Sequence, residues 1–280
     1  MENINVSDLI RKEIKKLEIE LANTKYGKTL KDKNIIIVGP DPRILGTKLG
    51  KQIDNYDIVI RLNTTINYIP FPQNLIEDIG SRTDCIYLCP SSMRELTESG
   101  SCIKTTSKIN NIINKFKNTK LKFINYQNGN KNGKYIIGDY VYPAELNAIK
   151  KVIDINNKDH SNKINVHNSS NTCQILEHIL GIIGNTNINT VPRTGCLAIF
   201  EALCAGAKSI TIEGMSFYNG GGHIFRKDVT TDLDPLKNHL NAKSPHNSVI
   251  ELELIKILLH LYPTKIIINN KYLNEILNQN

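Results

Sequence analysis

The feature that most constrains the fold is a buried strand that ends in a glycine turn near the start of the chain. The run Asn34–Val38 is apolar and rich in β-branched residues, and Gly39 follows it directly. A helix is expected at 45–53 and a second strand at 57–62. This β–loop–α–β opening is of the Rossmann type, in which parallel strands are buried on both faces by helices.

Strand and helix patterns alternate through most of the remaining chain. Further strands are expected at 84–88, 121–125, 209–213 and 265–268. Further helices are expected at 104–116, 143–153, 172–183, 195–205 and 248–261. The stretches 127–134 and 155–171, rich in Asn, Lys and Gly, are expected to be surface loops too short to separate domains. The pattern predicts an α/β fold, with one domain over residues 31–280 built on a Rossmann-like, mostly parallel sheet with helices on both faces.

Residues 1–30 are expected to form an N-terminal helical extension. Apolar residues recur at three-to-four spacing between residues 7 and 22, with Lys and Glu between them, and Ser7 is placed to cap this helix. They are Ile10, Ile14, Leu17 and Leu21. Only about two heptads fit, which favours a docking helix or a weak homodimer over a long coiled coil. The Tyr26–Lys28 run is expected to break the helix.

Charge narrows the class of partner. The formal net charge of +8 suits an anionic ligand and also suits simple solubility. Basic residues are spread along the chain and are not interleaved with aromatic residues, so a nucleic-acid partner is not expected.

The cysteines and the apolar runs indicate a reducing, aqueous setting. No C-x-x-C pair occurs among the six cysteines, and Cys85 and Cys89 have no second pair or nearby histidine, which argues against structural zinc. Cys196 and Cys204 lie in apolar runs and are expected to be buried thiols. No apolar stretch reaches the length of a membrane span, and the charged start of the chain does not resemble a signal peptide. We therefore expect a soluble, cytoplasmic protein.

The segment from Val38 to Gly50 carries the first chemical motif. Glycines after a strand let the backbone turn tightly and approach a ligand, and the start of a following helix attracts phosphate. The segment matches neither G-x-G-x-x-G nor the P-loop pattern G-x-x-x-x-G-K-[ST]. Alone, this turn does not separate a phosphate-binding loop from a structural one.

The residues that follow are similar to a family motif. Ile53-Asp54 is followed by a strand that ends in Arg61-Leu62-Asn63, and then by Asp78-Ile-Gly-Ser-Arg-Thr83. This succession resembles the large sialyl motif of the eukaryotic-type sialyltransferases, glycosyltransferase family 29. The resemblance needs no gap up to Asn63, and it places the family's glycines at Gly39, Gly46 and Gly50.

Three later blocks follow in the family's order. Val191-Pro-Arg-Thr-Gly195 opens a helix that leads to a strand ending at Glu213-Gly214, which resembles the small sialyl motif. His223 follows a glycine run and stands at the third motif. His246 and Glu251 match the His-x4-Glu pattern of the very short motif. An isolated histidine is more often structural than catalytic, but the ordered blocks over residues 33–261 favour the family.

The resemblance implies a variant GT-A fold and an inverting, metal-independent transfer. The donor would be a CMP-sugar that carries sialic acid or a related 2-keto sugar acid, the acceptor would be a hydroxyl of a glycan, and no cofactor or metal is implied. His246 would be the base that deprotonates the acceptor, and His223 would donate to the leaving phosphate. Glu251 is carried over by the motif, either for catalysis or to orient the helix start or the histidine. The implied donor-binding residues are Gly39, Pro40, Asp41, Asn63, Arg193, Thr194, Gly195 and Gly214.

Three departures from the family pattern bear on the identity of the donor. Pro40 replaces an Asn that contacts the donor in the family, and Arg193 replaces the Ser of Pro-Ser-Thr-Gly. The arginine charge suits a phosphate or a carboxylate. Ile224 and Phe225 replace the aromatic residues that follow the third-motif histidine. CMP-Kdo, another 2-keto acid donor, is therefore kept as the alternative to CMP-sialic acid.

A fourth departure concerns the disulfide that joins the two longer motifs in the family. Its two positions fall near Ile35 and Gly206, so the bond is absent here. That loss agrees with a reducing compartment and with the lack of a membrane anchor.

Two other classes of protein remain as alternatives. A different Rossmann-like enzyme, such as a methyltransferase, needs an acidic residue after the second strand, but that strand ends in Arg61-Leu62-Asn63. A non-catalytic sugar-nucleotide binder is favoured by the altered Pro40 and Arg193. The triplet Asp232-Leu-Asp234 fits a D-x-D metal motif formally, but it has no preceding strand.

Overall fold

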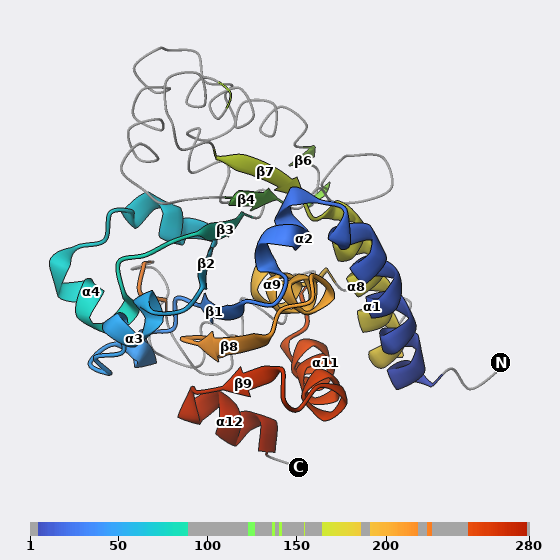
Figure 1. Ribbon diagram of the computed structural model, residues 1–280. Coiled ribbons are helices and arrows are strands. Elements are labelled where there is room, and N and C mark those ends of the chain that lie inside the picture. Colours follow the sequence, from blue (N-terminus) through green and yellow to red (C-terminus); the bar gives the residue numbers. More distant parts are fainter. Residues whose placement is uncertain are drawn as a thin grey trace.

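A seven-stranded sheet forms the centre of the protein (Figure 1). The computed structural model describes residues 5–88, 123–126, 136–137, 140–141, 154, 164–185, 191–217, 223–225 and 246–278. The strand order is β7-β4-β3-β2-β1-β8-β9, and all neighbouring pairs are parallel. The strands are β1 (Asn34–Val38), β2 (Ile58–Leu62), β3 (Cys85–Leu88), β4 (Phe123–Tyr126), β7 (Asn165–Asn168), β8 (Ser209–Glu213) and β9 (Ile266–Ile268). The predicted α/β class with a parallel sheet is confirmed.

Helices cover both faces of this sheet. The helices are α1 (Val6–Ala22), α2 (Lys25–Leu30), α3 (Gly50–Asp54), α4 (Gln73–Ile79), α8 (Ser170–Ile183), α9 (Thr194–Cys204), α11 (Ser248–Leu261) and α12 (Lys271–Asn278). In Figure 1, α1, α8 and α9 lie together on one side, and α3 and α4 lie on the other. Two 3-10 turns, η1 (Pro42–Ile44) and η2 (Asn63–Tyr68), and a small antiparallel pair, β5 (Ile136–Ile137) with β6 (Tyr140–Val141), complete the described part.

Strand β1 shows why its sequence is apolar throughout. Ile35 and Ile37 point into a core cluster shared with α1, α8, α9 and α11. Ile36 and Val38 point to the opposite face, into a second cluster that includes Ile53 of α3. Because successive side chains alternate between faces and both faces are covered, every position of the strand is buried and favours an apolar residue.

The point at which the strand order reverses lies next to β1. From β1 the chain adds β2, β3, β4 and β7 on one side, whereas β8 and β9 are added on the other. Val38 is paired in register with Arg61 of β2 and with Glu213 of β8. The three strands therefore end at the same level, and ligands of open parallel sheets bind beyond the strand ends at such a reversal.

The helix α1 uses its apolar face within the chain itself. Its four regularly spaced apolar residues are 0 to 3% exposed and belong to the core cluster with α8 and α9. They are Ile10, Ile14, Leu17 and Leu21. This face is therefore not available to a second copy, and the homodimer stays a prediction. The N-cap is Asn5, whose side chain accepts from the Ser7 N–H at 3.0 Å, so the expected Ser7 cap is wrong by two residues.

Several boundaries differ from the sequence prediction. The single helix expected at 45–53 is wrong, because the chain forms the η1 turn, passes through an exposed Gly46 at φ +81° and becomes helical only at Gly50. The Tyr26–Lys28 run lies inside α2 instead of breaking the helix, since Thr24 caps a new helix by accepting from the Gly27 N–H.

The last part of the predicted loop 155–171 also differs from the sequence prediction. Residues 165–168 form the edge strand β7, so that part of the loop prediction is wrong. Helices α4 and α12 were not predicted. The helices expected at 104–116 and 143–153, the loop at 127–134 and residues 155–163 lie outside the described residues. No helix of the described part is long and apolar enough to cross a membrane.

Candidate functional site

The carboxyl ends of β1 and β8 are in close backbone contact. The Gly39 N–H donates to the Glu213 carbonyl at 2.9 Å, and the Asp41 N–H donates to the Gly214 carbonyl at 2.9 Å. A Cβ on Gly39 would lie 2.4 Å from the Gly214 oxygen, and Gly214 itself has φ +59°. Only glycine fits these two positions, because the turn after β1 and the segment after β8 pack directly against each other there.

The turn continues into an arginine–carboxylate pair. Asp41 is buried, and its carboxylate accepts from the Arg43 N–H at 3.0 Å and from the guanidinium at 2.9 and 2.7 Å. The Arg43 guanidinium also stacks 3.4 Å from the ring centroid of Tyr272 in α12. Asp41 thus caps η1 and holds Arg43, while the half-buried Pro40 contributes only its ring and backbone to this turn.

A side-chain hydrogen bond joins the two longer motifs. The Asn63 amide and the Thr194 hydroxyl lie 3.1 Å apart, although they are 131 residues apart in the sequence. Asn63 follows β2 directly and has φ +49°, which an asparagine tolerates better than most residues. Thr194 is the first residue of α9. The bond therefore fixes the start of α9 at the end of β2.

Met215 connects this contact to the β1 turn. A Cβ on Gly39 and a Cβ on Gly195 would each lie 2.4 Å from atoms of the Met215 side chain. The turn after β1, the segment after β8 and the first turn of α9 therefore pack around one methionine. These are the segments that the two longer motifs were expected to bring together.

Other polar residues of the large motif form hydrogen bonds with backbone groups near the turn after β1. Arg61 is fully buried, and its guanidinium donates to the carbonyl of Arg82 at 3.0 Å. Asp54 accepts from the Ser81 N–H and the Arg82 N–H, each at 2.9 Å. Asp78 accepts from the Lys48 N–H at 2.9 Å. These side chains are structural, because they hold α3, α4 and the ends of β2 and β3 together through backbone groups.

A buried ion pair stands at the start of α9. Arg193 is the residue before the helix, and no side chain caps the helix at this position. Glu251 of α11 is 0% exposed, and its carboxylate accepts from both the backbone N–H and the guanidinium of Arg193. Burial raises the pKa of Glu251, and the Arg193 charge and its hydrogen bonds oppose that rise. The glutamate therefore faces the arginine at this helix start.

His246 lies beside the same segment. Its Nδ1 is 2.7 Å from the Val191 carbonyl, which can only accept, so Nδ1 carries the proton and the lone pair of a neutral ring lies on Nε2. Burial lowers the pKa of His246 to about 4, and the positive charge of Arg193 acts in the same direction. The imidazole is therefore neutral at cellular pH, as a general base must be.

His223 is attached to the turn after β1. Its Nδ1 accepts from the Phe225 N–H at 3.1 Å, so a neutral ring carries its proton on Nε2. The neighbouring Ile224 N–H donates to the Pro40 carbonyl at 2.8 Å. The segment 223–225 is therefore docked on Pro40, and His223 has the tautomer of a hydrogen-bond donor.

Phe225 is held from the other side by Tyr68. The Tyr68 hydroxyl donates to the Phe225 carbonyl at 2.8 Å, and the two rings stack with centroids 4.6 Å apart. Tyr68 ends η2, the turn that begins at Asn63. The third-motif segment thus rests on both strand-end turns.

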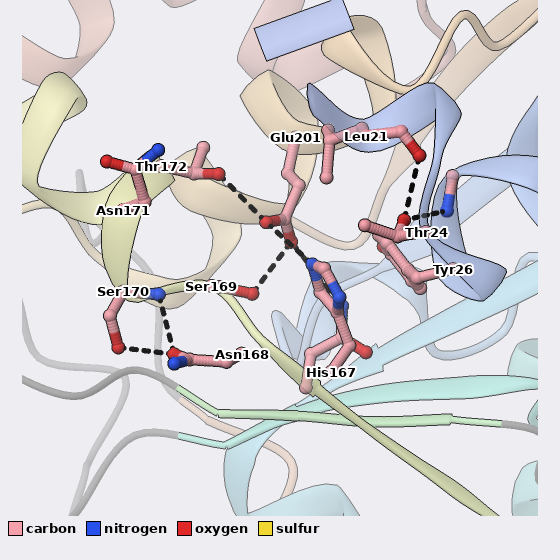
Figure 2. Close-up of polar contacts among 12 residues, drawn as sticks. Leu21, Thr24, Tyr26, His167, Asn168, Ser169, Ser170, Asn171, Thr172 and Glu201 are labelled. Carbon is pink, nitrogen blue, oxygen red and sulfur yellow. Dashed lines mark hydrogen bonds and ion pairs between the residues drawn. The ribbon is translucent and has the colours of Figure 1, made fainter. Parts of the chain in front are cut away.

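Sequence reasoning missed one polar cluster in the middle of α9. Glu201 is fully buried, and its carboxylate accepts from Tyr87 at 2.7 Å, Ser169 at 2.7 Å, Thr172 at 3.0 Å and His167 at 3.1 Å. Figure 2 shows Ser169, Thr172 and His167 converging on it from the β7–α8 segment. The signal was a single charged residue in the otherwise apolar run 195–205.

The cysteines and acidic groups define no metal site in the described part of the chain. Among those residues, no three His, Cys, Asp or Glu side chains are grouped for a metal ion. The expected burial of the Cys196 and Cys204 thiols is confirmed, and burial raises the pKa of each. Cys89 and the Asp232–Asp234 triplet lie outside the described residues.

Comparisons with known proteins agree with this geometry. The sequence profile of glycosyltransferase family 29 (sialyltransferase) matches residues 2–206. The sialyltransferase CstII from Campylobacter jejuni, solved with the substrate analogue cytidine-5'-monophosphate, is similar at 15% identity and a TM-score of 0.51, over 87% of this chain and 84% of that chain. CST-II solved with a trisaccharide acceptor and CMP is similar at 17% identity and a TM-score of 0.51, over 89% and 88% of the two chains. These likenesses show a shared fold, and no curated protein sequence matches the chain.

Proposed function

The chain belongs to glycosyltransferase family 29, the sialyltransferases, and on that premise we propose that it transfers a sialic acid from a CMP-sugar to a hydroxyl of a glycan. The family match confirms the resemblance predicted from the motifs. The proposed reaction is a single displacement that inverts the anomeric centre and uses no metal ion. CMP-Kdo is kept as the alternative donor, since both donors present a 2-keto acid on CMP.

The observation that carries this proposal is the Asn63–Thr194 hydrogen bond. It joins the large motif to the start of the small motif, and both of these residues lie within the matched residues 2–206. The start of α9 supplies backbone N–H groups and a positive dipole end, which suit a phosphate. The close contact of Gly39 with Gly214 holds the turn after β1 at the strand reversal, where ligands of open parallel sheets bind. These features support a donor site lined by Gly39, Pro40, Asp41, Asn63, Arg193, Thr194, Gly195 and Gly214. Within it, the Asp41 carboxylate holds the Arg43 guanidinium in place.

The catalytic assignments rest on the motif resemblance and on the two histidine tautomers, because the matched residues end at 206. Nε2 of a neutral His246 is proposed to take the proton of the acceptor hydroxyl as its oxygen attacks the anomeric carbon. Nε2–H of His223 is proposed to donate to the phosphate oxygen that leaves with CMP. Base catalysis of this kind typically contributes about 10²–10⁴-fold.

Metal independence follows from the charge of the proposed leaving group. The leaving group of a CMP-sugar is CMP, a monophosphate ester. It carries less charge than the nucleoside diphosphate that leaves a UDP- or GDP-sugar. One histidine donor and a helix start can then stabilise the charge that develops. We expect full transfer activity in EDTA, measured as CMP release from the purified chain. A strict requirement for added Mg²⁺ or Mn²⁺ would remove this part of the proposal.

A donor screen tests the function directly. The purified chain is incubated with CMP-sialic acid, CMP-Kdo, UDP-sugars and GDP-sugars, each with a mixture of glycan acceptors, and nucleotide release is measured. Release from a CMP-sugar alone is expected. If CMP raises the Tm but no donor is turned over, the chain is a sugar-nucleotide binder instead. Release from a UDP- or GDP-sugar contradicts the proposed donor class.

Two variants separate catalysis from binding. His246→Ala is expected to abolish transfer and to leave the Kd for CMP nearly unchanged, because the base contacts the acceptor and not the nucleotide. His260→Ala is the control, since His260 is exposed in the last turn of α11. Unchanged turnover in His246→Ala would remove the base assignment while leaving the family intact.

A further inference from the structure

The ion pair at the start of α9 differs from an ordinary surface salt bridge. Arg193 and Glu251 have side chains that are 9% and 0% exposed, and Arg193 stands where the family motif has a small serine. Glu251 binds the main chain and the guanidinium of the same residue. The backbone contact does not depend on the side chain at position 193, so what arginine adds here, and serine does not, is the charged guanidinium contact.

The pair is one of two attachments between the same two segments. Val191 holds His246 through its carbonyl, and Arg193 holds Glu251. Residues 191–193 lead into α9, whereas residues 246–251 lead into α11. A single hydrogen bond would allow the histidine segment to rotate about it. The second attachment, two residues further along one segment and five along the other, prevents that rotation.

We propose that Arg193 and Glu251 are positioning residues, whose buried pair fixes His246 relative to the start of α9 at Thr194. The inference rests on the proposed function, in which Thr194 binds the donor and His246 deprotonates the acceptor. It assigns Glu251 no contact with either substrate. Arg193 has a double role, because its side chain is part of the donor-site wall and also the counter-charge of Glu251.

The charge that faces His246 from the start of α9 makes the inference testable. Arg193 lowers the pKa of His246 through its positive charge, and Glu251, in the first turn of α11, is the ion-pair partner of that arginine. Removing the arginine removes the charge that lowers the imidazole pKa, whereas removing the glutamate leaves that charge unpaired. The two single variants should therefore shift the titration of His246 in opposite directions. Opposite shifts would show that the pair acts on His246, and kcat separates positioning from stability.

The first experiment follows His246 by NMR in labelled protein, with His246→Gln used to assign the ring signals. Arg193→Gln is expected to raise the pH midpoint of the His246 titration by about one unit, and Glu251→Gln to lower it by about one unit. Arg82→Gln is the matched control. It breaks the Arg82–Asp84 ion pair, which lies just before the start of β3, and is expected to cause no shift. Equal midpoints in both single variants would overturn the inference.

The second experiment separates positioning from stability. The double variant Arg193→Met, Glu251→Leu replaces the ion pair with apolar side chains, which commonly preserves the stability of a buried site. We expect it to keep a Tm close to that of the natural chain and to lose about 10²-fold in kcat, because an error of about 1 Å in the position of the base is enough for such a loss. A double variant that keeps both its Tm and its kcat would show that the pair does not position His246.

The two experiments also keep this inference separate from the proposed function. If His246→Ala retains turnover while the NMR midpoints shift in opposite directions, the base assignment fails and the positioning role of the Arg193–Glu251 pair remains. If His246→Ala is inactive while the midpoints do not move, the positioning role of the pair fails and the base assignment remains. A single variant leaves one buried charge unpaired, so if a single variant does not fold, the Tm and kcat of the double variant decide the outcome.

Discussion

The two histidines of the candidate site differ in which ring nitrogen carries the proton. The Val191 carbonyl places the proton of His246 on Nδ1, whereas the Phe225 N–H places that of His223 on Nε2. The partner of Nδ1 is in each case a backbone group. One ring is thereby prepared to accept a proton and the other to donate one.

The lowered pKa of His246 predicts an unusual pH dependence of transfer. Because its pKa is about 4 instead of 6.5, the ring remains neutral well below pH 6.5, as the proposed base must be. We expect kcat/KM to fall on the acid side with an apparent pKa of about 4, once the loss of donor in buffer alone is subtracted. An acid limb centred near 6.5 would contradict either the burial of this ring or its role as the base.

The glycine pair at the strand ends gives a second prediction at this scale. Gly214→Ala adds a Cβ that would lie 2.7 Å from the Gly39 oxygen, at a position with φ +59°. We expect a loss of stability above about 1 kcal/mol and at least about tenfold weaker CMP binding, measured by urea unfolding and by calorimetry. Gly46→Ala is the control, since Gly46 has φ +81° but no atom within 4 Å of its Cβ position. CMP binding that is equal in the two variants would contradict a donor site at this contact.

At the scale of elements, the Glu201 cluster holds α9 against the far half of the sheet. Its donors come from β3, from β7 and from the start of α8, and Asn125 of β4 lies 3.4 Å away. Burial raises the pKa of Glu201, but the hydrogen bonds and the charge of His167 outweigh burial and leave it below its ordinary value. The helix that begins at the candidate donor site is therefore fixed at its middle by a charged group.

Glu201→Gln should test this anchor. We expect a loss of about 1–3 kcal/mol in the free energy of unfolding at pH 7, because a fully hydrogen-bonded carboxylate is replaced by an amide with one acceptor oxygen. The pKa is depressed in the folded state, so this stability is present at neutral pH and is lost as the pH falls below about 4.5. Glu20→Gln, at an exposed site on α1, is the control and should change stability by less than about 0.5 kcal/mol. An equal effect of the two variants in urea unfolding would contradict the anchor.

Elements were predictable where a local signal and the burial agreed. The strands 34–38 and 209–213 and the helix 248–261 have the predicted limits, since apolar runs or a capping Asn247 define them. The edge strand β7 was missed because its sequence, NVHN, is polar, and its stability comes from β4 and from the contact of His167 with Glu201. Such long-range partners leave no local pattern in a sequence.

The candidate site was also predictable only in part. The motifs predicted which segments meet, and the structure places Asn63 on Thr194 and the β1 turn on Gly214. The partner of Arg193 was not predictable, because Glu251 lies 58 residues away and becomes its neighbour only through folding. The catalytic and donor-binding roles themselves stay predictions until the variants are measured.

At the scale of the whole molecule, the first helix completes the core that carries the site. Truncation of residues 1–24 would remove the four buried side chains of α1 from the cluster shared with α8 and α9. We expect this truncated chain to be insoluble or to lack a cooperative unfolding transition. A graded test compares two substitutions in α1 by urea unfolding. Leu17→Ala is expected to lower the free energy of unfolding by about 2–5 kcal/mol, because Leu17 is buried. Ile19→Ala should lower it by less than about 0.5 kcal/mol, because Ile19 is 71% exposed. A soluble truncated chain with a Tm equal to that of the full chain would contradict this role.

The position of α1 in the core has a consequence for synthesis on the ribosome. The apolar stripe that ends at Leu21 is made first, but α8, one of the two helices that cover it, begins only at Ser170, which is 170 − 21 = 149 residues later. At a synthesis rate of about 5–20 residues per second, the ribosome reaches the start of α8 roughly 7–30 s after it has completed the stripe. A nascent chain in that interval presents an amphipathic helix without α8 and α9, the two helices that complete its burial, and such a segment is the kind that chaperones bind.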